Sequence, residues 1–458
     1  MKKYSNVMNT NVTWIPQIPA HWKLQKINAL FTERKKKVSD KDYKPLSVTK
    51  KGILPQLAHA AKSNDSDNRK LVKAGDFVIN SRSDRKGSCG VSKLDGSVSL
   101  INIVLTPRNE LNSEYIHYLL RNYRFSEEYY RNGRGIVADL WTTRYSEMRT
   151  ILIPVPPRAE QDQIVRFLDW KVSEINRLIR IKKNQINGYR EYEKKVINDK
   201  VLYGLQEAPL RESGNYWVGK IPTNWKIIKL GKFCSFQNGI SESGNFFTSG
   251  TPFVGYSDVY RHLEIPKYVK GVAKANEQQQ EIFSVRKGDI FFTRTSESIE
   301  EIGMAAVCKH TIKDAVFSGF LIRCRPRMPL INEDYMKYYL QIPAVRNHFS
   351  SMMNIVIRAS LGQNLLKQMP VVVPPLKEQK EIAEFLDAMH ERFLRLITTN
   401  EEEISMLEVL RSTLISDVVT GKIDVRNIPV PAYEHVDGRV ADDGEDNDEE
   451  TGIPGEED

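Results

Sequence analysis

Residues 14–27 read WIPQIPAHWKLQKI, and residues 217–230 read WVGKIPTNWKIIKL. Both stretches follow the frame W-x-x-x-I-P-x-x-W-K-x-x-K, and they begin 203 positions apart (217 minus 14). Solenoid repeats have periods of about 20–50 residues, so a spacing of this length indicates a duplicated domain instead. The chain of 458 residues is therefore predicted to carry one domain-sized module twice.

A second motif closes each copy of the module. Residues 155–161 read VPPRAEQ and residues 373–379 read VPPLKEQ, and FLD follows at the same spacing in both. An apolar run typical of a strand precedes each Pro-Pro, and the glutamate after it suits the first turn of a helix. A Gly-Asp pair, Gly75-Asp76 in one copy and Gly288-Asp289 in the other, is a further correspondence. Each module is thus predicted to be a globular domain followed by a helix.

The two segments after Pro-Pro are predicted to be long helices that pair as an antiparallel coiled coil. In the first helix a 3.5-residue seam passes through Leu168, Val172, Ile175, Ile179, Lys182 and Ile186. In the second helix the seam passes through Leu386, Phe393, Ile397, Asn400, Ile404 and Leu407. About four heptads in each are enough for pairing, and about 40 helical residues span roughly 60 Å. Two amphipathic helices, each buried in its own domain, are the alternative.

The net charge of +9 conceals two strongly basic blocks. Residues 1–157 carry +13 and residues 211–375 carry +8, whereas residues 158–210 carry +3 and residues 376–436 carry −5. Residues 437–458 hold eleven acidic residues and one basic residue. Positive charge concentrated in two blocks indicates a polyanionic partner, most commonly nucleic acid. A lysine-rich surface without such a partner is the alternative.

The predicted fold class is α+β: two globular α/β domains separated by two long antiparallel coiled-coil helices, with a pseudo-twofold internal repeat. Strands are expected at 75–80, 97–105, 288–293 and 317–324, and helices at 113–130 and 333–349. The predicted boundaries are 1–157 and 211–375 for the domains, 158–210 and 376–425 for the spacer helices, and 426–458 for an acidic tail predicted to be disordered.

Several catalytic signatures occur only in fragments. Residues 133–138 match GxGxxA but do not follow a strand, and residues 214–221 resemble a P-loop with Ile221 where Mg²⁺ needs Ser or Thr. The four cysteines are scattered, which argues against a zinc site or a disulfide framework. An enzyme with its own chemistry is therefore disfavoured. Because the sequence shows neither a secretory signal nor a spanning apolar run, a cytoplasmic location is expected.

The motif P-P-x-x-E-Q-x-x-I, at residues 156–164 and 374–382, resembles the specificity (S) subunit of type I restriction–modification systems. The W-x-x-x-I-P-x-x-W openings and the segment LISDVVTGKIDV at residues 414–425 resemble the same family, so the likeness covers residues 14–425. It implies two target recognition domains, each reading one half of a split DNA sequence, with the paired helices setting the number of unspecified bases between. Arg158, where an apolar residue is usual, and the acidic tail depart from the family pattern.

The resemblance also implies that this chain is a non-catalytic subunit that binds no cofactor. Its expected partners are double-stranded DNA with a bipartite target, two modification subunits that carry S-adenosylmethionine and methylate adenine, and two restriction subunits that use ATP and Mg²⁺ to translocate and cut. A stand-alone DNA-binding or scaffolding protein that bridges two sites is the alternative.

Candidate DNA contacts are cationic or amide side chains among short hydroxyl residues in loops, a combination that suits phosphate oxygens and guanine edges. After the strand at Gly75 these are Arg82, Ser83, Arg85 and Lys86. After the strand at Gly288 they are Arg294, Thr295 and Ser296. Further candidates are Arg134, Gln237, Asn238 and Arg358. Ordinary solvated turns are the alternative.

Lys182 and Asn400 make both seams polar at their centres. If the helix ends are level, so that Leu168 faces Leu414, Lys182 falls opposite Asn400. Paired polar seam residues can fix the register of a coiled coil at some cost in stability. Replacing both residues by Leu is therefore expected to raise the melting temperature and to loosen the register. Calorimetry and cysteine cross-linking of the double variant test this hypothesis, and it fails if neither property changes.

Overall fold

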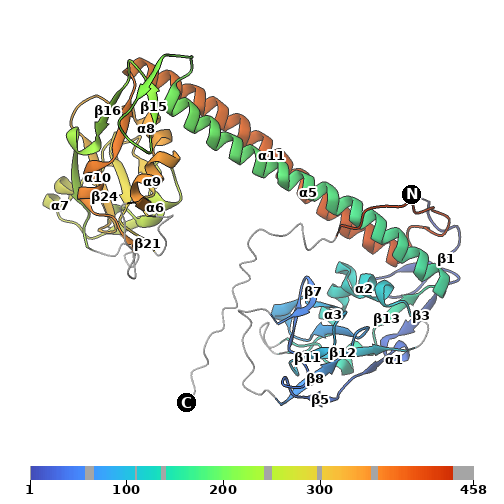
Figure 1. Cartoon of the computed structure of the whole chain (residues 1–458). Helices are drawn as coiled ribbons and strands as arrows, with labels where there is room; N and C mark the ends of the chain where they lie inside the picture. Colours follow the sequence, from blue (N-terminus) through green and yellow to red (C-terminus); the bar gives the residue numbers. More distant parts are fainter. Residues whose placement is uncertain are drawn as a thin grey trace, which may run out of the picture. The chain divides into compact units, whose positions relative to one another are not determined.

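The computed structural model describes residues 2–56, 67–108, 111–135, 141–241, 250–296, 302–351 and 359–436. The chain forms two compact units: unit 1 comprises Met1–Gln185 with Thr399–Asp458, and unit 2 comprises Ile186–Thr398. The division falls within two long helices, α5 (Arg158–Tyr203) and α11 (Leu376–Val419) (Figure 1). Each unit therefore contains one globular domain and part of both helices.

The elements of the first domain are short and mostly β. Its strands are β1 (Val7–Asn9), β2 (Gln17–Pro19), β3 (Lys23–Lys26), β4 (Phe31–Glu33), β5 (Lys37–Val38), β6 (Leu46–Thr49), β7 (Gly52–Pro55), β8 (Arg69–Val72), β9 (Phe77–Asn80), β10 (Cys89–Val91), β11 (Gly96–Val98), β12 (Asn102–Pro107) and β13 (Leu152–Val155). Its helices are α1 (Ile27–Leu30), α2 (Ser113–Arg121), α3 (Tyr123–Arg131) and α4 (Tyr145–Met148).

The second domain has a similar series of elements. Its strands are β14 (Leu210–Glu212), β15 (Lys220–Pro222), β16 (Lys226–Lys229), β17 (Cys234–Asn238), β18 (Thr251–Val254), β19 (Gly271–Ala273), β20 (Ile290–Thr293), β21 (Thr295–Ser296), β22 (Ala305–Val307), β23 (Val316–Phe317), β24 (Leu321–Pro326), β25 (Ala359–Ser360) and β26 (Pro370–Val373). Its helices are α6 (Tyr256–Tyr260), α7 (Glu277–Ile282), α8 (Glu333–Tyr339), α9 (Pro343–Ser351) and α10 (Gln363–Gln368).

Both units are built around the same four-stranded antiparallel sheet. The strand order is β10-β9-β12-β4 in unit 1 and, read in the same direction, β22-β20-β24-β17 in unit 2. The strands thus correspond one to one in chain order. A buried core joins each sheet to its helices, including Tyr115 and Leu168 in unit 1 and Tyr335 and Leu386 in unit 2. The predicted fold class and the internal repeat are confirmed.

The opening and closing motifs recur together because they pair with each other. In unit 1, β3 pairs antiparallel with β13, the strand that ends before the first Pro-Pro. In unit 2, β16 pairs with β26 in the same way. The indole nitrogen of Trp22 donates to Glu160 at 3.1 Å, and that of Trp225 donates to Glu378 at 2.9 Å. The tryptophan of one motif is therefore bound to the first helical turn of the other.

The repeated Gly-Asp pair forms a turn that holds a buried carboxylate. Gly75 and Gly288 have φ of 91° and 87°, a conformation that glycine adopts without steric cost. Asp76 accepts a bidentate pair of hydrogen bonds from Arg34, at 2.7 and 3.0 Å. Asp289 accepts a similar bidentate pair from Arg325, which lies on β24, at 2.6 and 2.7 Å. Each turn precedes the central strand β9 or β20 and so fixes where that strand begins.

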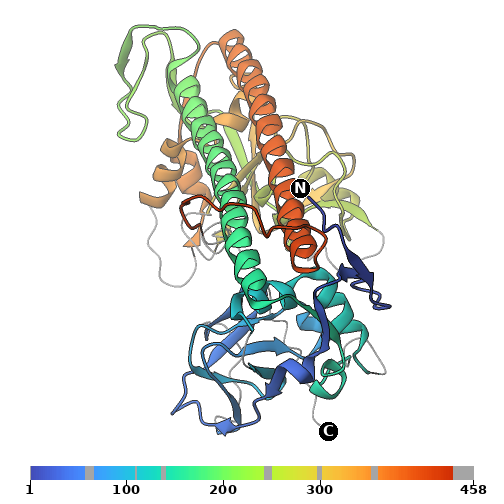
Figure 2. The same ribbon diagram turned by 90° about the vertical axis from the view of Figure 1, so that its right-hand side faces the viewer.

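Helices α5 and α11 lie side by side and antiparallel within each unit (Figures 1 and 2). In unit 2, His390 contacts Glu193 at 2.7 Å, and in unit 1, Arg411 donates to Asn176 at 2.7 Å, so rising numbers in α5 meet falling numbers in α11. The predicted seam residues that are buried are Leu168, Ile175, Ile179, Ile186, Leu386, Phe393, Ile397 and Asn400. Those that are half-buried are Val172, Lys182, Ile404 and Leu407.

The polar centre of the seam has a partner that the sequence did not suggest. The Nζ atom of Lys182 lies 2.5 Å from a carboxylate oxygen of Glu403, whereas the level-ends alignment paired Lys182 with Asn400. Asn400 is only 6% exposed. The lysine charge is therefore neutralised one helical turn away from the buried amide, at the edge of the seam.

Both long helices end at a glycine that packs on a motif tryptophan. Gly204 follows α5 with φ of 83°, and Gly421 follows α11 by two residues with φ of 75°. A Cβ at Gly204 would lie 3.2 Å from the ring of Trp225, and a Cβ at Gly421 would lie 3.2 Å from the ring of Trp22. The helices are therefore shorter than the predicted spacers, which extended to residues 210 and 425.

The predicted helices at 113–130 and 333–349 are each divided into two. Asn122 lies between α2 and α3, where its side chain accepts a hydrogen bond from the backbone nitrogen of Phe125 at 3.1 Å. Pro343 opens α9 and provides the corresponding break in unit 2. The predicted strands 97–105 and 317–324 are likewise each interrupted by a turn.

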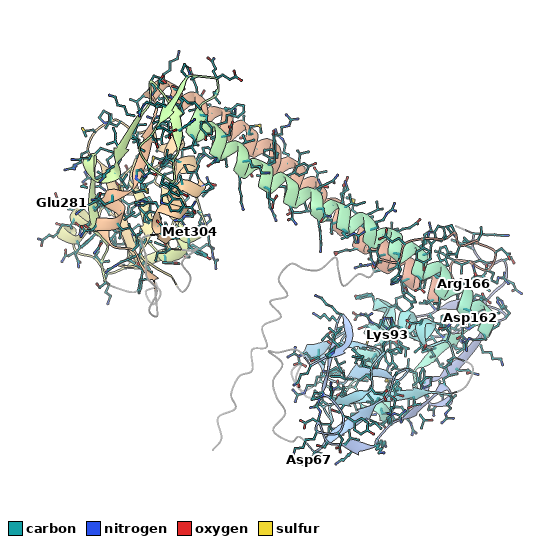
Figure 3. The ribbon with its side chains drawn as sticks, viewed as in Figure 1. Asp67, Lys93, Asp162, Arg166, Glu281 and Met304 are labelled. Atoms are coloured by element: carbon teal, nitrogen blue, oxygen red, sulfur yellow. The ribbon has the colours of Figure 1, made fainter. Side chains whose placement is uncertain are left out.

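The segment 426–436, which the sequence grouped with the acidic tail, packs against α5. The side chain of Gln163 donates to the carbonyl oxygens of Val425 and Ile428 at 3.1 and 2.8 Å, and Asn176 donates to that of Val436 at 3.0 Å. Asp162 and Arg166 lie beside Gln163 on the first turns of α5 (Figure 3). Residues 426–436 therefore belong to the folded part of the chain, and the tail prediction for residues 437–458 falls outside the described residues.

Within the ranges that the structure describes, none of the helices combines the length and the apolar character that a bilayer crossing requires. The four cysteines are all buried, and none of them forms a disulfide.

Two glycines give a matched test of these helix ends. Gly188 lies in the middle of α5 with open space around its Cα, so Gly188→Ala is expected to stabilise the chain by about 0.5–1 kcal/mol. Gly421→Ala would place a Cβ into Pro19 at a positive φ and is expected to destabilise it by at least about 1–2 kcal/mol. Thermal unfolding of the full chain measures both, and shifts of the same sign would contradict this account.

Candidate nucleic-acid interface

The predicted basic loops begin where the two central strands end. Arg82 comes two residues after β9, and Arg294 comes directly after β20. Since β9 and β20 occupy the same place in the two sheets, the two arginines belong to equivalent edges. In unit 2 this edge includes β21, which lies at the end of the unit farthest from the two long helices (Figure 1).

In unit 1, the fold gathers three loops around Thr142. Its backbone forms bridges with both Arg82 and Arg134, so residues that are 52 positions apart in the chain (134 minus 82) become neighbours. Both arginines are exposed, and the side chain of Arg134 is 84% accessible. Two candidates for phosphate contact thus lie on one surface, which the sequence did not indicate.

A carboxylate accompanies Arg134. Glu147 lies 3.7 Å from the guanidinium. Burial raises the pKa of Glu147, but hydrogen bonds from Ser146 and the backbone, with the charge of Arg134, outweigh burial and leave that pKa below its usual value. Glu147 is therefore negative at neutral pH, and it orients Arg134 at the cost of part of its attraction for phosphate.

The other loop residues of unit 1 differ in their partners. Ser83 and Arg85 form a single 3₁₀ turn, in which Arg85 lies 3.8 Å from Asp84. Lys86 is bound within the domain, because its Nζ atom lies 2.5 Å from Glu127 and 4.8 Å from the centre of the Tyr130 ring. The charge of Lys86 is therefore already paired within the domain.

A small cavity lies beside Arg82, and its size limits what this surface could enclose. Its volume is about 20 Å³, which holds roughly one water molecule and no nucleotide. Cys89 lines it, and burial raises the pKa of that thiol to about 11. A neutral thiol is a poor nucleophile, so Cys89 is a packing residue. No group of three or more potential metal ligands occurs among the described residues.

In unit 2, the predicted residues fall on two neighbouring segments. Thr295 and Ser296 form β21, which pairs with β25, and the backbone of Leu361 donates to Arg294 at 2.7 Å. Gln237 and Asn238 end β17, and Asn238 accepts a hydrogen bond from Gln363 at 3.0 Å. Arg358 lies outside the described residues.

Thr142 and Gln363 were missed by the sequence reasoning. Neither residue belongs to a charged or repeated pattern, and each reaches its partner only through the tertiary fold. Gln363 is an amide that can contact a base edge, but it follows Gly362 at the start of a six-residue helix, where its composition is unremarkable for a surface turn.

With this geometry established, comparison with known proteins shows what the chain is similar to. Residues 222–406 match the family described as "Type I restriction modification DNA specificity domain". The chain is therefore similar to type I specificity subunits. The resemblance drawn from the Pro-Pro and tryptophan motifs is thereby confirmed.

Individual relatives of this family agree. The chain is 22% identical over 336 residues to a Methanocaldococcus jannaschii protein named as the MjaX specificity subunit of a type I restriction enzyme, covering 71% of each chain. It is 24% identical over 295 residues to the EcoKI specificity subunit of Escherichia coli, covering 61% of this chain and 59% of that one. The alignment with the second relative thus spans less than two thirds of its length.

A solved structure supports the fold. A chain from a structural study of the assembly and conformational transition of the type I R-M system superposes with a TM-score of 0.66. The superposition covers 89% of this chain and 99% of that chain at 16% sequence identity. At this identity the likeness establishes the arrangement of the elements, and the roles of individual residues must be argued from this chain.

Arg82, Lys86 and Arg294 allow a direct test of the interface. Arg82→Ala and Arg294→Ala are each expected to weaken DNA binding by about tenfold and, if the contact is to phosphate, to lower the log–log salt slope by about 1. Lys86→Ala should change affinity by less than about threefold, because Glu127 already binds this charge. Titrations of the assembled methyltransferase at several salt concentrations measure these effects. Unchanged affinity and sequence preference in both arginine variants would rule out the assignment.

Proposed function

We propose that this chain is the DNA-recognition subunit of a type I restriction–modification complex and has no catalytic activity of its own. The observation that carries the proposal is the duplicated sheet, with an arginine-bearing loop at the same edge in both units. Family membership of residues 222–406 supports it. The net charges of +13 and +8 on the two blocks supply the attraction to phosphate.

In this proposal, each unit reads one half of a bipartite target. Lysine and arginine contacts to phosphate provide affinity, and amide and guanidinium groups at base edges provide specificity. The paired α5 and α11 set the number of unspecified bases between the halves. A helix pair suits this task because its length is fixed by 1.5 Å per residue and resists compression.

The chemistry would belong to the partners. Two modification subunits would bind S-adenosylmethionine and methylate adenine, and two restriction subunits would use ATP and Mg²⁺ for translocation and cleavage. This chain would position them on DNA in the cytoplasm. The neutral thiol at Cys89 and the one-water cavity beside it are consistent with a recognition surface.

The long helices offer an apolar surface for a modification subunit. The heptad register places Leu178 and Ile181 of α5 on the same flank as Met406 and Leu410 of α11, because g positions of antiparallel helices face each other. Their exposed fractions are 44% and 43% on α5, and 69% and 54% on α11. The opposite flank of α5 is covered by the segment 426–436. An exposed apolar strip of this kind is typical of a protein interface.

Co-purification and methylation test the function together. The full chain is expected to co-purify with the modification subunit encoded beside it, and deleting its gene should erase methylation of one split adenine-containing motif from the host genome. Met406→Glu with Leu410→Glu should abolish co-purification, because each buries a carboxylate in an apolar contact. Glu408→Lys, on the other flank of α11, is the matched control and should have no effect.

Two results would contradict the proposal. A chain that binds DNA without retaining any modification subunit favours the stand-alone bridging protein. An unchanged methylome after gene deletion excludes the role in modification.

A further inference from the structure

An exposed apolar side chain stands beside the arginine loop of unit 2. The ring of Phe320 is 61% exposed, whereas those of Phe233, Phe291, Phe292, Phe317 and Phe349 in the same domain are buried. The backbone nitrogen of Arg294 donates to the carbonyl oxygen of Phe320 at 2.8 Å. An exposed phenylalanine is therefore fixed next to a predicted DNA contact.

The turn that carries Phe320 is held firmly by its own backbone. Leu321 closes the turn by donating to the carbonyl of Ser318 at 2.9 Å. Ser318 donates to Val254 at 3.0 Å, Gly319 to Ile240 at 2.6 Å, and the Phe320 nitrogen to the Ser318 hydroxyl at 3.2 Å. Every backbone donor from Ser318 to Leu321 is thus bound. The turn is therefore a rigid support for the ring of Phe320.

Unit 1 repeats this turn with aliphatic residues. Asn102 closes it by donating to the carbonyl of Ser99 at 3.1 Å, as Leu321 does to Ser318. Leu100 and Ile101, which are 37% and 39% exposed, occupy its tip. The turn precedes β12, whose first residue pairs with Asn80, two residues before Arg82. Single exposed apolar residues are common on proteins, but the same turn beside the same basic loop in both units is a pattern.

We propose that Phe320, with Leu100 and Ile101 in unit 1, is an apolar wedge that enters the base stack of the DNA half-site read by its unit. The inference rests on the proposed DNA-recognition function. Phe, Leu and Ile are the side chains that proteins insert between base steps, and insertion needs a rigid support because unstacking opposes it. The aliphatic residues in unit 1 argue for wedging over stacking on an aromatic face. The adjacent arginines hold the phosphates on either side of the opened step.

The first test measures base unstacking by the wild-type complex and needs no substitution. The complex of the full chain with its modification subunits is bound to duplexes of its methylated motif that carry 2-aminopurine at successive positions outside the methylated base. Fluorescence of 2-aminopurine rises when the base loses its neighbour. One step in each half-site is expected to brighten on binding. If no position outside the methylated base brightens although the complex binds its target, the wedge is excluded and the recognition function stands.

Substitutions then assign each step to its residue. Phe320→Ala is expected to weaken target binding by about 10–100-fold, equivalent to about 1.4–2.8 kcal/mol, and to remove the signal from one half-site only. Leu100→Ala with Ile101→Ala should remove it from the other half-site. Phe320→Leu should retain binding within about threefold, because unit 1 uses aliphatic residues. Tyr216→Ala is the matched control, because Tyr216 is an 88% exposed aromatic residue between β14 and β15. Strand β15 lies at the opposite end of unit 2 from β21 (Figure 1).

The outcomes separate the two proposals. Loss of affinity in Phe320→Ala with the 2-aminopurine signal intact overturns the wedge, because the ring then contacts DNA without opening it. Equal effects of Phe320→Ala and Tyr216→Ala also overturn it. A wild-type complex that binds no sequence specifically overturns the proposed function and the wedge with it.

Discussion

The structure depends on one interaction that is made twice: a tryptophan indole donating to a glutamate in the first turn of a long helix. In unit 1, Glu160 is 6% exposed and accepts hydrogen bonds from Trp22, from the ring of His21 at 2.7 Å and from the hydroxyl of Tyr4. In unit 2, Glu378 accepts the bond from Trp225. A carboxylate near a helix N-terminus is favoured by the helix dipole, and its partners fix the direction in which the helix leaves the domain.

The residues next to these two glutamates explain why more of the motif is repeated. Gln161 accepts from the backbone of Asn112 at 2.9 Å, and Gln379 accepts from Asn332 at 2.8 Å, so the glutamine of each motif holds the start of α2 or α8. The hydroxyl of Tyr115 then donates to the last residue of α11, at 3.3 Å, and that of Tyr335 donates to the end of α5, at 3.1 Å. Each domain thus forms hydrogen bonds to the beginning of one long helix and to the end of the other.

The two units differ outside the shared four-stranded sheet and its contacts with the long helices. The sheet β11-β8-β5 of unit 1 is antiparallel, whereas in unit 2 the strand β18 pairs antiparallel with β19 and parallel with β23. The loops after β9 and β20 carry different side chains on equivalent edges. A rigid frame with variable loops lets two copies of one fold contact different bases, since specificity comes from a few side chains at base edges.

The sequence by itself determined the duplication, the long helices and most of their seam. These features repeat at fixed spacing, and apolar periodicity reports burial directly. It also indicated the resemblance to type I specificity subunits, because two motifs recur in the same order. Only the tertiary structure decided that Lys182 meets Glu403, that Lys86 is bound to Glu127, and that Arg82 and Arg134 share one surface. The exposure of Phe320 was likewise decided only by the tertiary structure. Each of these depends on which loops and helix turns the fold brings together, and local sequence carries no signal for contacts between distant residues.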